Sequence, residues 1–158
     1  MEKMIIRKGK IEDALDIKKL FIELGIDQLS KDKYYKYKMP DNDIDVKEIV
    51  EALNNKNAII FVAELSNKII GYIEAYITEP DYYFFCDRYV YILHAFVDKK
   101  FRGFNIMREL HLNVEEWAKK NEVKYVEADV FYHNIVAKEI LDYLGYEGYR
   151  TRYVKTLK

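Results

Sequence analysis

The chain has 158 residues, of which 50% are hydrophobic and 34% are charged, with a formal net charge of -1. This length suits one folded domain over residues 1–158, and the charge balance argues against a nucleic-acid or membrane-surface partner, because such partners favour a basic excess. The single cysteine, Cys86, cannot form an intramolecular disulfide, and no leader or apolar membrane-spanning run is visible. We therefore expect a cytoplasmic protein.

The first half of the chain predicts a strand, two helices and a β-hairpin. Apolar residues recur at helical spacing before Gly25, which we expect to end the first helix. Ser66 and Asn67 separate two runs rich in β-branched and aromatic residues, a pattern typical of an antiparallel hairpin. In chain order the predicted elements are a strand at 4–9, a helix at 10–24, a polar connection at 27–45, a helix at 45–55 and strands at 58–65 and 68–78.

The second half predicts a parallel crossover followed by a helix and a closing strand. Met107, Leu110, Val114 and Trp117 form one apolar stripe, which indicates a helix packed on a sheet. The predicted elements are a strand at 88–98, a helix at 105–120, a strand at 124–131, a helix capped by Asn134 and ended by Gly145, and a strand at 148–157. We expect an α/β (α+β) fold whose mixed, largely antiparallel sheet contains a central βαβ crossover.

Four cations gather where the crossover helix begins: Lys99, Lys100, Arg102 and Arg108. The positive end of a helix dipole repels each exposed cation by roughly 0.3–1 kcal/mol, so we expect a negative partner there. Gly103 lets the backbone approach a ligand, Asn105 can cap the helix, and Arg102 can hold two phosphate oxygens. The loop therefore predicts a pyrophosphate site, and the alternative left open is a solvated charged surface.

Several stretches resemble the GCN5-related N-acetyltransferases (GNAT). The family's crossover loop reads Gln or Arg, two residues, Gly, one residue, then Gly or Ala, and here Arg102 stands first while Asn105 and Met107 occupy the two small-residue positions. "VEADVFYHNIVAKEILDYLGY" is similar to its second signature through Asn134, Ala137, Gly145 and Tyr146. "NKIIGYIEAYI" and "LHAFVDKKFRG" resemble its third strand and its strand and loop beside the pantetheine.

The resemblance implies a GNAT-like acyl-CoA N-acyltransferase fold and an enzyme that uses acetyl-CoA as co-substrate. It implies transfer of the acetyl group to a primary amine by direct attack in a ternary complex. The implied cofactor-binding residues are Ala95, Phe96, Val97, Arg102, Gly103, Phe104, Asn105, Ile106, Met107 and Asn134.

The catalytic residues are less well defined by the sequence. Leu141 stands where the family often has a tyrosine acid, and Tyr91 stands where it can have a base. His94 and Glu74 suit proton transfer better, since histidine titrates near neutrality and a carboxylate can accept a proton. Tyr91 and His94 are therefore the catalytic candidates. A histidine satisfied on an outward strand position and a solvated sheet face are the alternatives for His94 and Glu74.

The acceptor side is predicted from aromatic and acidic residues. Tyrosines in the long connection, together with Glu74, are candidate substrate-binding residues, and nearby acids including Asp27 would suit a cationic amine. The tyrosines are Tyr34, Tyr35 and Tyr37. The expected partner is a small-molecule or peptide amine, without nucleic acid, membrane or metal, and a homodimer is left open. An acyl-CoA-binding module or regulator with little or no turnover remains the alternative function.

Overall fold

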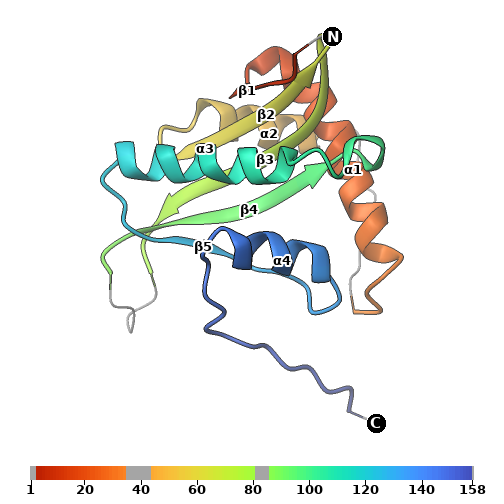
Figure 1. Ribbon diagram of the computed structural model, residues 1–158, viewed down its shortest axis with the longest axis vertical. Helices are drawn as coiled ribbons and strands as arrows, with labels where there is room; N and C mark the ends of the chain where they lie inside the picture. Colours follow the sequence, from red (N-terminus) through yellow and green to blue (C-terminus); the bar gives the residue numbers. More distant parts are fainter. Residues whose placement is uncertain (1–2, 35–43, 81–85, 158) are drawn as a thin grey trace.

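The computed structural model describes residues 3–34, 44–80 and 86–157. A five-stranded sheet runs through the molecule, with helices on both of its faces (Figure 1). The elements are β1 (Ile5–Lys8), α1 (Ala14–Leu29), α2 (Ile44–Asn54), β2 (Ala58–Leu65), β3 (Lys68–Thr78), β4 (Tyr89–Val97), α3 (Ile106–Lys120), β5 (Val126–Ala128) and α4 (Ile135–Tyr143), with 3-10 turns at Ile11–Asp13 and Lys99–Phe101.

The sheet has the order β1-β2-β3-β4-β5. Its first four strands pair antiparallel, whereas β4 and β5 pair parallel across α3. The predicted hairpin is confirmed: Ser66 and Asn67 have φ values of 53° and 59°, which suit the tight turn of a two-residue hairpin. The mixed, largely antiparallel sheet and the βαβ crossover are thus both confirmed.

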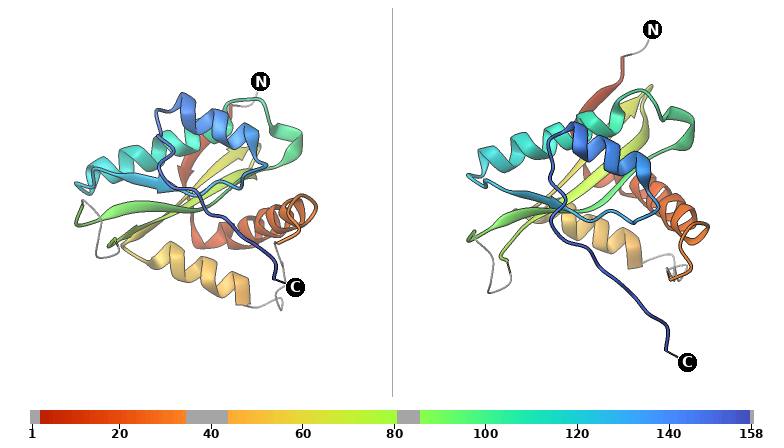
Figure 2. Two further views of the ribbon diagram at one scale, coloured as in Figure 1. Left: turned by 90° about the horizontal axis from the view of Figure 1, so that it is seen from below. Right: turned by 60° about the horizontal axis from the view of Figure 1, so that its bottom comes forward.

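Two hydrophobic clusters hold the helices on the sheet. On one face Leu110, Val114 and Trp117 of α3 are buried against the strands, as the apolar stripe predicted. On the other face Ile17 and Leu20 of α1 are buried with residues of α2. Figure 2 shows α3 and α4 on one side of the sheet and α1 and α2 on the other. Burial of each large apolar side chain contributes about 1.5–3 kcal/mol to this packing.

Helix α1 does not end at Gly25, so that prediction is wrong. The helix continues to Leu29, and its last turn buries Asp27 and Gln28. A glycine inside a helix costs about 1 kcal/mol relative to alanine. The tertiary contacts of the last turn outweigh this local preference, because Asp27 pairs with cations of the crossover loop.

The predicted closing strand over 148–157 is also wrong. This segment contains neither helix nor strand and is exposed throughout. It leaves the sheet beside β5 and runs outward (Figures 1 and 2). Its alternating pattern is strand-like, but a strand also requires a neighbour to which it can bond. Without this strand, β5 lies at the edge of the sheet.

Burial of His111 in α3 predicts a pH-dependent stability. His111 is 5% exposed, and burial lowers its pKa from 6.5 to about 4. The unfolded chain therefore binds this proton below pH 6.5 while the folded chain does not, and stability falls as the pH drops through that window. Between pH 7 and pH 5 we expect His111 to account for a loss of about 2 kcal/mol.

Urea unfolding of wild type and of His111→Leu at both pH values measures this contribution. The variant should lose about 2 kcal/mol less than wild type over the interval, and His133→Gln, as a control, should behave like wild type. Equal pH dependence in wild type and His111→Leu would contradict the prediction.

Candidate active site

The pairing of β4 with β5 ends partway along β4. Only Val90–Ile92 pair with Val126–Ala128. At the same level the register of β4 with β3 shifts: Glu74 faces His94 and Ala75 faces Ile92, so Leu93 is an extra residue in β4. Such a bulge bends a strand and re-aims the residues beyond it. Beyond Leu93, β4 pairs with β3 alone, and a gap opens toward β5.

The bulge also changes which backbone groups face that gap. Val90 N–H donates to the carbonyl of Tyr125, on the β5 side, whereas Asp98 N–H donates to the carbonyl of Ile70, on the β3 side. Bonding direction alternates with each residue along a strand. The extra residue inverts this alternation, so the N–H groups of Ala95 and Val97 point into the gap. Of the three predicted backbone contacts in β4, Phe96 instead directs its N–H toward β3.

The loop after β4 is shaped by two residues in the left-handed region. Gly103 has a φ of 87° and Asn105 a φ of 59°. A Cβ at Gly103 would meet no atom within 4 Å, so its backbone is open to a ligand. Phe104 between them is 70% exposed.

The expected cap on α3 is not made, because the Asn105 side chain forms no capping hydrogen bond. The first-turn N–H groups of a helix have no partner within the helix. In α3 the side chain of Asn105 does not supply one either. The N-terminus of this 15-residue helix therefore presents backbone donors to an anion.

The side chains at the family's two small-residue positions are placed differently. Met107 is partly buried against the hydrophobic cluster of α3 and the sheet, whereas Asn105, at the other position, is exposed. The Met107 side chain is thus directed toward the core, so its replacement of a small residue does not by itself obstruct the predicted anion site.

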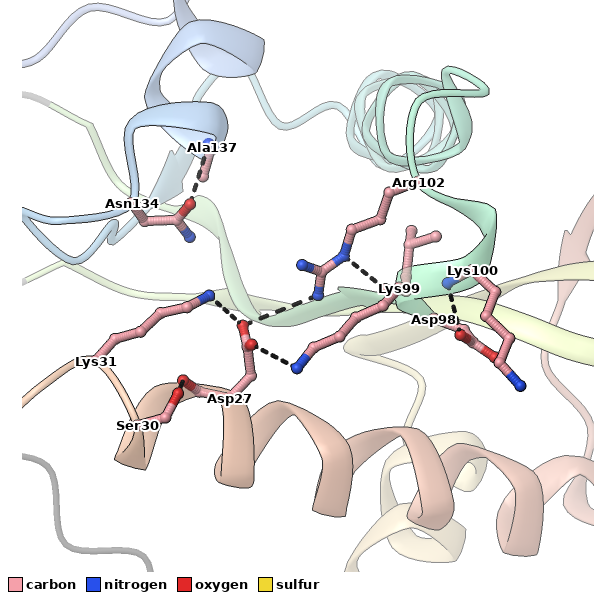
Figure 3. A network of polar contacts seen from close by, with 10 residues as sticks. Asp27, Ser30, Lys31, Asp98, Lys99, Lys100, Arg102, Asn134 and Ala137 are labelled. Carbon is pink, nitrogen blue, oxygen red and sulfur yellow. Dashed lines mark hydrogen bonds and ion pairs between the residues drawn. The ribbon is translucent and has the colours of Figure 1, made fainter.

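The negative partner of the clustered cations is Asp27. Its carboxylate lies 2.7 Å from Lys31 Nζ, 3.0 Å from Lys99 Nζ and 3.9 Å from a terminal nitrogen of Arg102 (Figure 3). Asp27 is 7% exposed. Burial alone would raise its pKa, but hydrogen bonds from Lys31 and Lys99 outweigh burial and lower the pKa. Asp27, in the last turn of α1, is therefore paired with cations of its own helix and of the crossover loop, and its expected role beside the acceptor amine stays a prediction.

Arg102 is positioned by three contacts. Its Nε donates to the carbonyl of Val97 at 3.2 Å, and its guanidinium lies 5.3 Å from the ring centre of Phe96. Together with the pairing to Asp27, these contacts hold the guanidinium beside the end of β4 and above the last turn of α1 (Figure 3). Arg108 does not join the cluster, since it pairs with Glu109 and lies over the ring of Tyr143.

His94 and Glu74 meet across the β3–β4 pair. His94 Nδ1 lies 2.9 Å from one carboxylate oxygen of Glu74, and Tyr76 OH donates to the other at 2.6 Å. Glu74 is 8% exposed, so the solvated sheet face expected as its alternative is wrong, whereas the contact with Glu74 fits the alternative of a satisfied histidine for His94. The edge of the Phe21 ring packs on His94. Tyr76 is a member of this cluster that was not among the predicted site residues.

Tyr91 lies on the same strand as His94, but its side chain does not contact Glu74 in the described hydrogen bonds. Its hydroxyl donates to Asp129 at 3.1 Å. Burial, followed by the charge of Asp129, raises the pKa of Tyr91 to about 12. The phenol is therefore a weaker acid than usual, and a phenolate base at neutral pH is disfavoured.

The remaining predicted site residues are Asn134 and three tyrosines of the long connection. Asn134 caps α4, because its side-chain oxygen accepts the N–H of Ala137 at 3.3 Å, which confirms the predicted cap. Tyr34 is exposed beneath Lys33, and among the described residues no hydrogen bond or ring contact joins it to His94 or Glu74. Tyr35 and Tyr37 lie outside the described residues.

The sequence matches the model of the acetyltransferase (GNAT) family over residues 24–146. The chain belongs to this family. No curated protein matches at a significant level. Within residues 3–34, 44–80 and 86–157, no helix is long and apolar enough to cross a membrane, and no three His, Cys, Asp or Glu side chains gather as a metal site.

Solved structures share the fold along almost the whole chain. A variant of BH1408 from Bacillus halodurans has a TM-score of 0.85 at 20% identity, covering 98% of this chain and 99% of that chain. Aminoglycoside N-acetyltransferase AAC(6')-Iy in complex with CoA gives 0.80 at 20%, covering 99% and 96%. A predicted acetyltransferase from Clostridium acetobutylicum with acetyl-CoA gives 0.73 at 19%, covering 98% and 96%. At 19–20% identity, these structural similarities establish the fold of the chain.

Replacing Asp27 tests whether this carboxylate ties α1 to the GNAT loop. Asp27→Asn should reduce the free energy of unfolding at pH 7 by about 1–2 kcal/mol, because charge-assisted hydrogen bonds from Lys31 and Lys99 are lost. Asp16→Asn, which removes an exposed pair with Lys19, should cost less than about 0.5 kcal/mol. Urea unfolding measures both, and equal losses would contradict the role of Asp27.

Proposed function

We propose that this GNAT protein transfers the acetyl group of acetyl-CoA to a primary amine by direct attack within a ternary complex. The observation that carries the proposal is the combination of a β4–β5 pairing that ends at Ile92, which leaves the backbone donors of Ala95 and Val97 without a β5 partner, with an uncapped helix N-terminus at the start of α3. The solved relatives named with CoA and acetyl-CoA support the same ligand here.

Acetyl-CoA would bind from the side of the crossover loop. Its pantetheine arm would lie along the gap and bond to the backbone N–H groups of Ala95 and Val97. Its pyrophosphate would accept from the first-turn N–H groups of α3 and from Arg102, whose planar fork suits two phosphate oxygens. The oxygen of Asn134 is used in capping α4, which leaves its amide nitrogen to donate across the gap.

The amine would arrive from the opposite face of the sheet. Phe96 belongs to the cluster on the α1 and α2 face, and His94, two residues earlier on the same strand, shares that face. With Nδ1–H donated to Glu74, the Nε2 atom of His94 is the one left to accept a proton. Tyr76 holds the carboxylate that orients the ring, as the third member of a catalytic triad does.

The proposed reaction proceeds without a covalent enzyme intermediate. The amine nitrogen attacks the thioester carbonyl carbon, the C–N bond forms and the C–S bond breaks. His94 Nε2 takes the amine proton directly or through one water. Donors in the gap stabilise the oxyanion. Because Leu141 replaces the family's frequent acid, the CoA thiolate would leave as the anion or take its proton from solvent.

The acceptor is proposed to be a cationic small molecule or peptide amine. Glu127 pairs with Tyr91 across the sheet, and Asp129 accepts the Tyr91 hydroxyl, so both carboxylates border the same face. Together with Glu74 they give this face a negative potential that attracts cations. The relatives named as aminoglycoside acetyltransferases support a polyamine-like acceptor. Tyr34, Tyr35 and Tyr37 remain candidates for lining it.

Removing the charge of Arg102 tests the cofactor side. Arg102→Gln should weaken acetyl-CoA binding by about 10–100-fold, because charge-assisted hydrogen bonds to the pyrophosphate are lost. Isothermal calorimetry measures the affinity. Lys120→Gln, which removes a cation from the opposite end of α3, should bind like wild type. Unchanged affinity in Arg102→Gln would count against the site.

Replacing His94 tests the base. His94→Gln should lower kcat/KM at pH 7 by about 100-fold or more with acetyl-CoA affinity unchanged, since general-base catalysis contributes roughly 10²–10⁴-fold. The loss of kcat/KM should become smaller as the pH rises, because the amine then loses its proton in solution. CoA release from a panel of amines provides the assay, and His133→Gln is the control.

Full activity of His94→Gln across the pH range would exclude His94 as the base. If wild type binds acetyl-CoA tightly but releases no CoA with any amine, the binding-module alternative would replace the enzyme.

A further inference from the structure

Helix α1 carries a polar side chain where its apolar stripe predicts a core residue. Ile17 and Leu20 are buried against the sheet, and Phe21 and Leu24 are partly buried on the same cluster. Gln28 follows Leu24 by four residues, so it continues this stripe toward the C-terminal end of the helix. It is 8% exposed. The sheet-facing side of α1 therefore ends in a buried amide.

The side-chain oxygen of Gln28 is buried without a hydrogen-bond donor. Among the described residues, none donates to its Oε1 atom. A buried amide oxygen that has given up water costs stability unless another donor replaces the water. An apolar side chain at this position would avoid that cost. Packing of the protein alone therefore does not account for a glutamine here, whereas an N–H donor on a ligand does.

Two contacts place the last turn of α1 beside the end of β4. Phe21, two turns before Gln28 on the same side of the helix, packs its ring edge on His94 of β4. Asp27, the neighbour of Gln28 in sequence, pairs with cations of the loop that follows β4 (Figure 3). Helix α1 and strand β4 therefore run in the same direction here, and Gln28 lies near the end of the strand.

The same end of β4 carries the donors proposed for the pantetheine arm of acetyl-CoA. The N–H groups of Ala95 and Val97 have no β5 partner, because the pairing with β5 ends at Ile92. The carbonyl of Val97 already accepts from Arg102 Nε at 3.2 Å. Pantetheine contains secondary amides, each with an N–H as well as a carbonyl. An N–H of the arm at the level of Val97 therefore needs another acceptor.

We propose that Gln28 binds the pantetheine arm of acetyl-CoA through its side-chain amide, with Oε1 accepting an N–H of the arm. This inference rests on the proposed function, because it requires the arm to lie in the gap beside β4. The amide nitrogen of Gln28 is a donor for a carbonyl of the same arm. The last turn of α1, tied to the loop by Asp27, then forms one wall of the cofactor site.

A ligand-binding role and a structural role of Gln28 predict different effects of its removal. A glutamine that stabilises the fold makes hydrogen bonds in the free protein, so its loss lowers stability. Within the described residues Oε1 of Gln28 makes none, so an apolar replacement removes the cost of a buried unpaired oxygen. The same replacement deprives the bound ligand of an acceptor. CoA affinity therefore falls without a loss of stability.

Gln28→Met tests the proposal, because methionine has a similar length and no amide. Its affinity for CoA, measured by isothermal calorimetry, should fall by about 5–50-fold, since an N–H of the arm loses its acceptor. In urea unfolding the ligand-free variant should be at least as stable as wild type. Ser30→Ala removes a hydroxyl that donates to the carbonyl of Asp27 in the same turn. As the matched control, it should bind CoA like wild type.

A fragment of CoA separates the pantetheine arm from the rest of the site. 3′-Phosphorylated ADP contains the pyrophosphate of CoA but no pantetheine. Gln28→Met should bind this fragment like wild type, whereas Arg102→Gln should bind it more weakly. Gln28→Leu, whose side chain has a different shape, repeats each measurement, so that a packing defect peculiar to methionine is recognised.

Three results would overturn the proposal. They are a CoA affinity of Gln28→Met equal to that of wild type, an equal loss of affinity for CoA and for the fragment, and a loss of stability in both the methionine and the leucine variants. A wild type that binds no CoA would instead refute the proposed function on which the inference rests.

Discussion

The bulge at Leu93 is the constraint on which the site depends. A strand that kept its register along β3 would direct the N–H groups of Ala95 and Val97 toward β3. One extra residue inverts the alternation and leaves these donors facing a gap where β5 has already turned away. The same bulge places His94 opposite Glu74, on the far face from α3. One irregularity of the backbone therefore arranges both the donors proposed for acetyl-CoA and the base proposed for the amine.

The positive charges of the loop between β4 and α3 are paired with a carboxylate of the protein itself. A helix N-terminus disfavours cations, and the cluster there is held by the buried carboxylate of Asp27. This arrangement links the last turn of α1 to the loop that precedes α3. It gives Lys99 and Arg102 defined positions beside the donors of the helix before a pyrophosphate arrives, so less side-chain freedom has to be lost on binding.

The elements with strong periodic patterns could be predicted from the sequence. The hairpin at Ser66 and Asn67, the crossover helix and the Asn134 cap all depend on short-range chemistry, and all are confirmed. The loop could also be located, because a cation cluster before a helix requires explanation. These features are encoded within a few residues of where they act.

The failures arose where distant residues decide the structure. Gly25 is a local stop signal, but Asp27 gains partners about 70 residues away, and the helix continues. The bulge at Leu93 leaves no mark in an unbroken strand pattern, since it depends on pairing with β3. Residues 148–157 have strand chemistry but lack a neighbour within the chain. Asn105 adopts a left-handed conformation, and its side chain does not form the expected cap.

We propose that the bulge presents the N–H groups of Ala95 and Val97 to acetyl-CoA. Amide chemical shifts of the ¹⁵N-labelled protein during a titration with CoA test it most directly. We expect large, saturable shifts for Ala95 and Val97 and for the first turn of α3, with a smaller shift for Phe96, whose N–H faces β3. Saturable binding that leaves the amides of Ala95 and Val97 unmoved would contradict it.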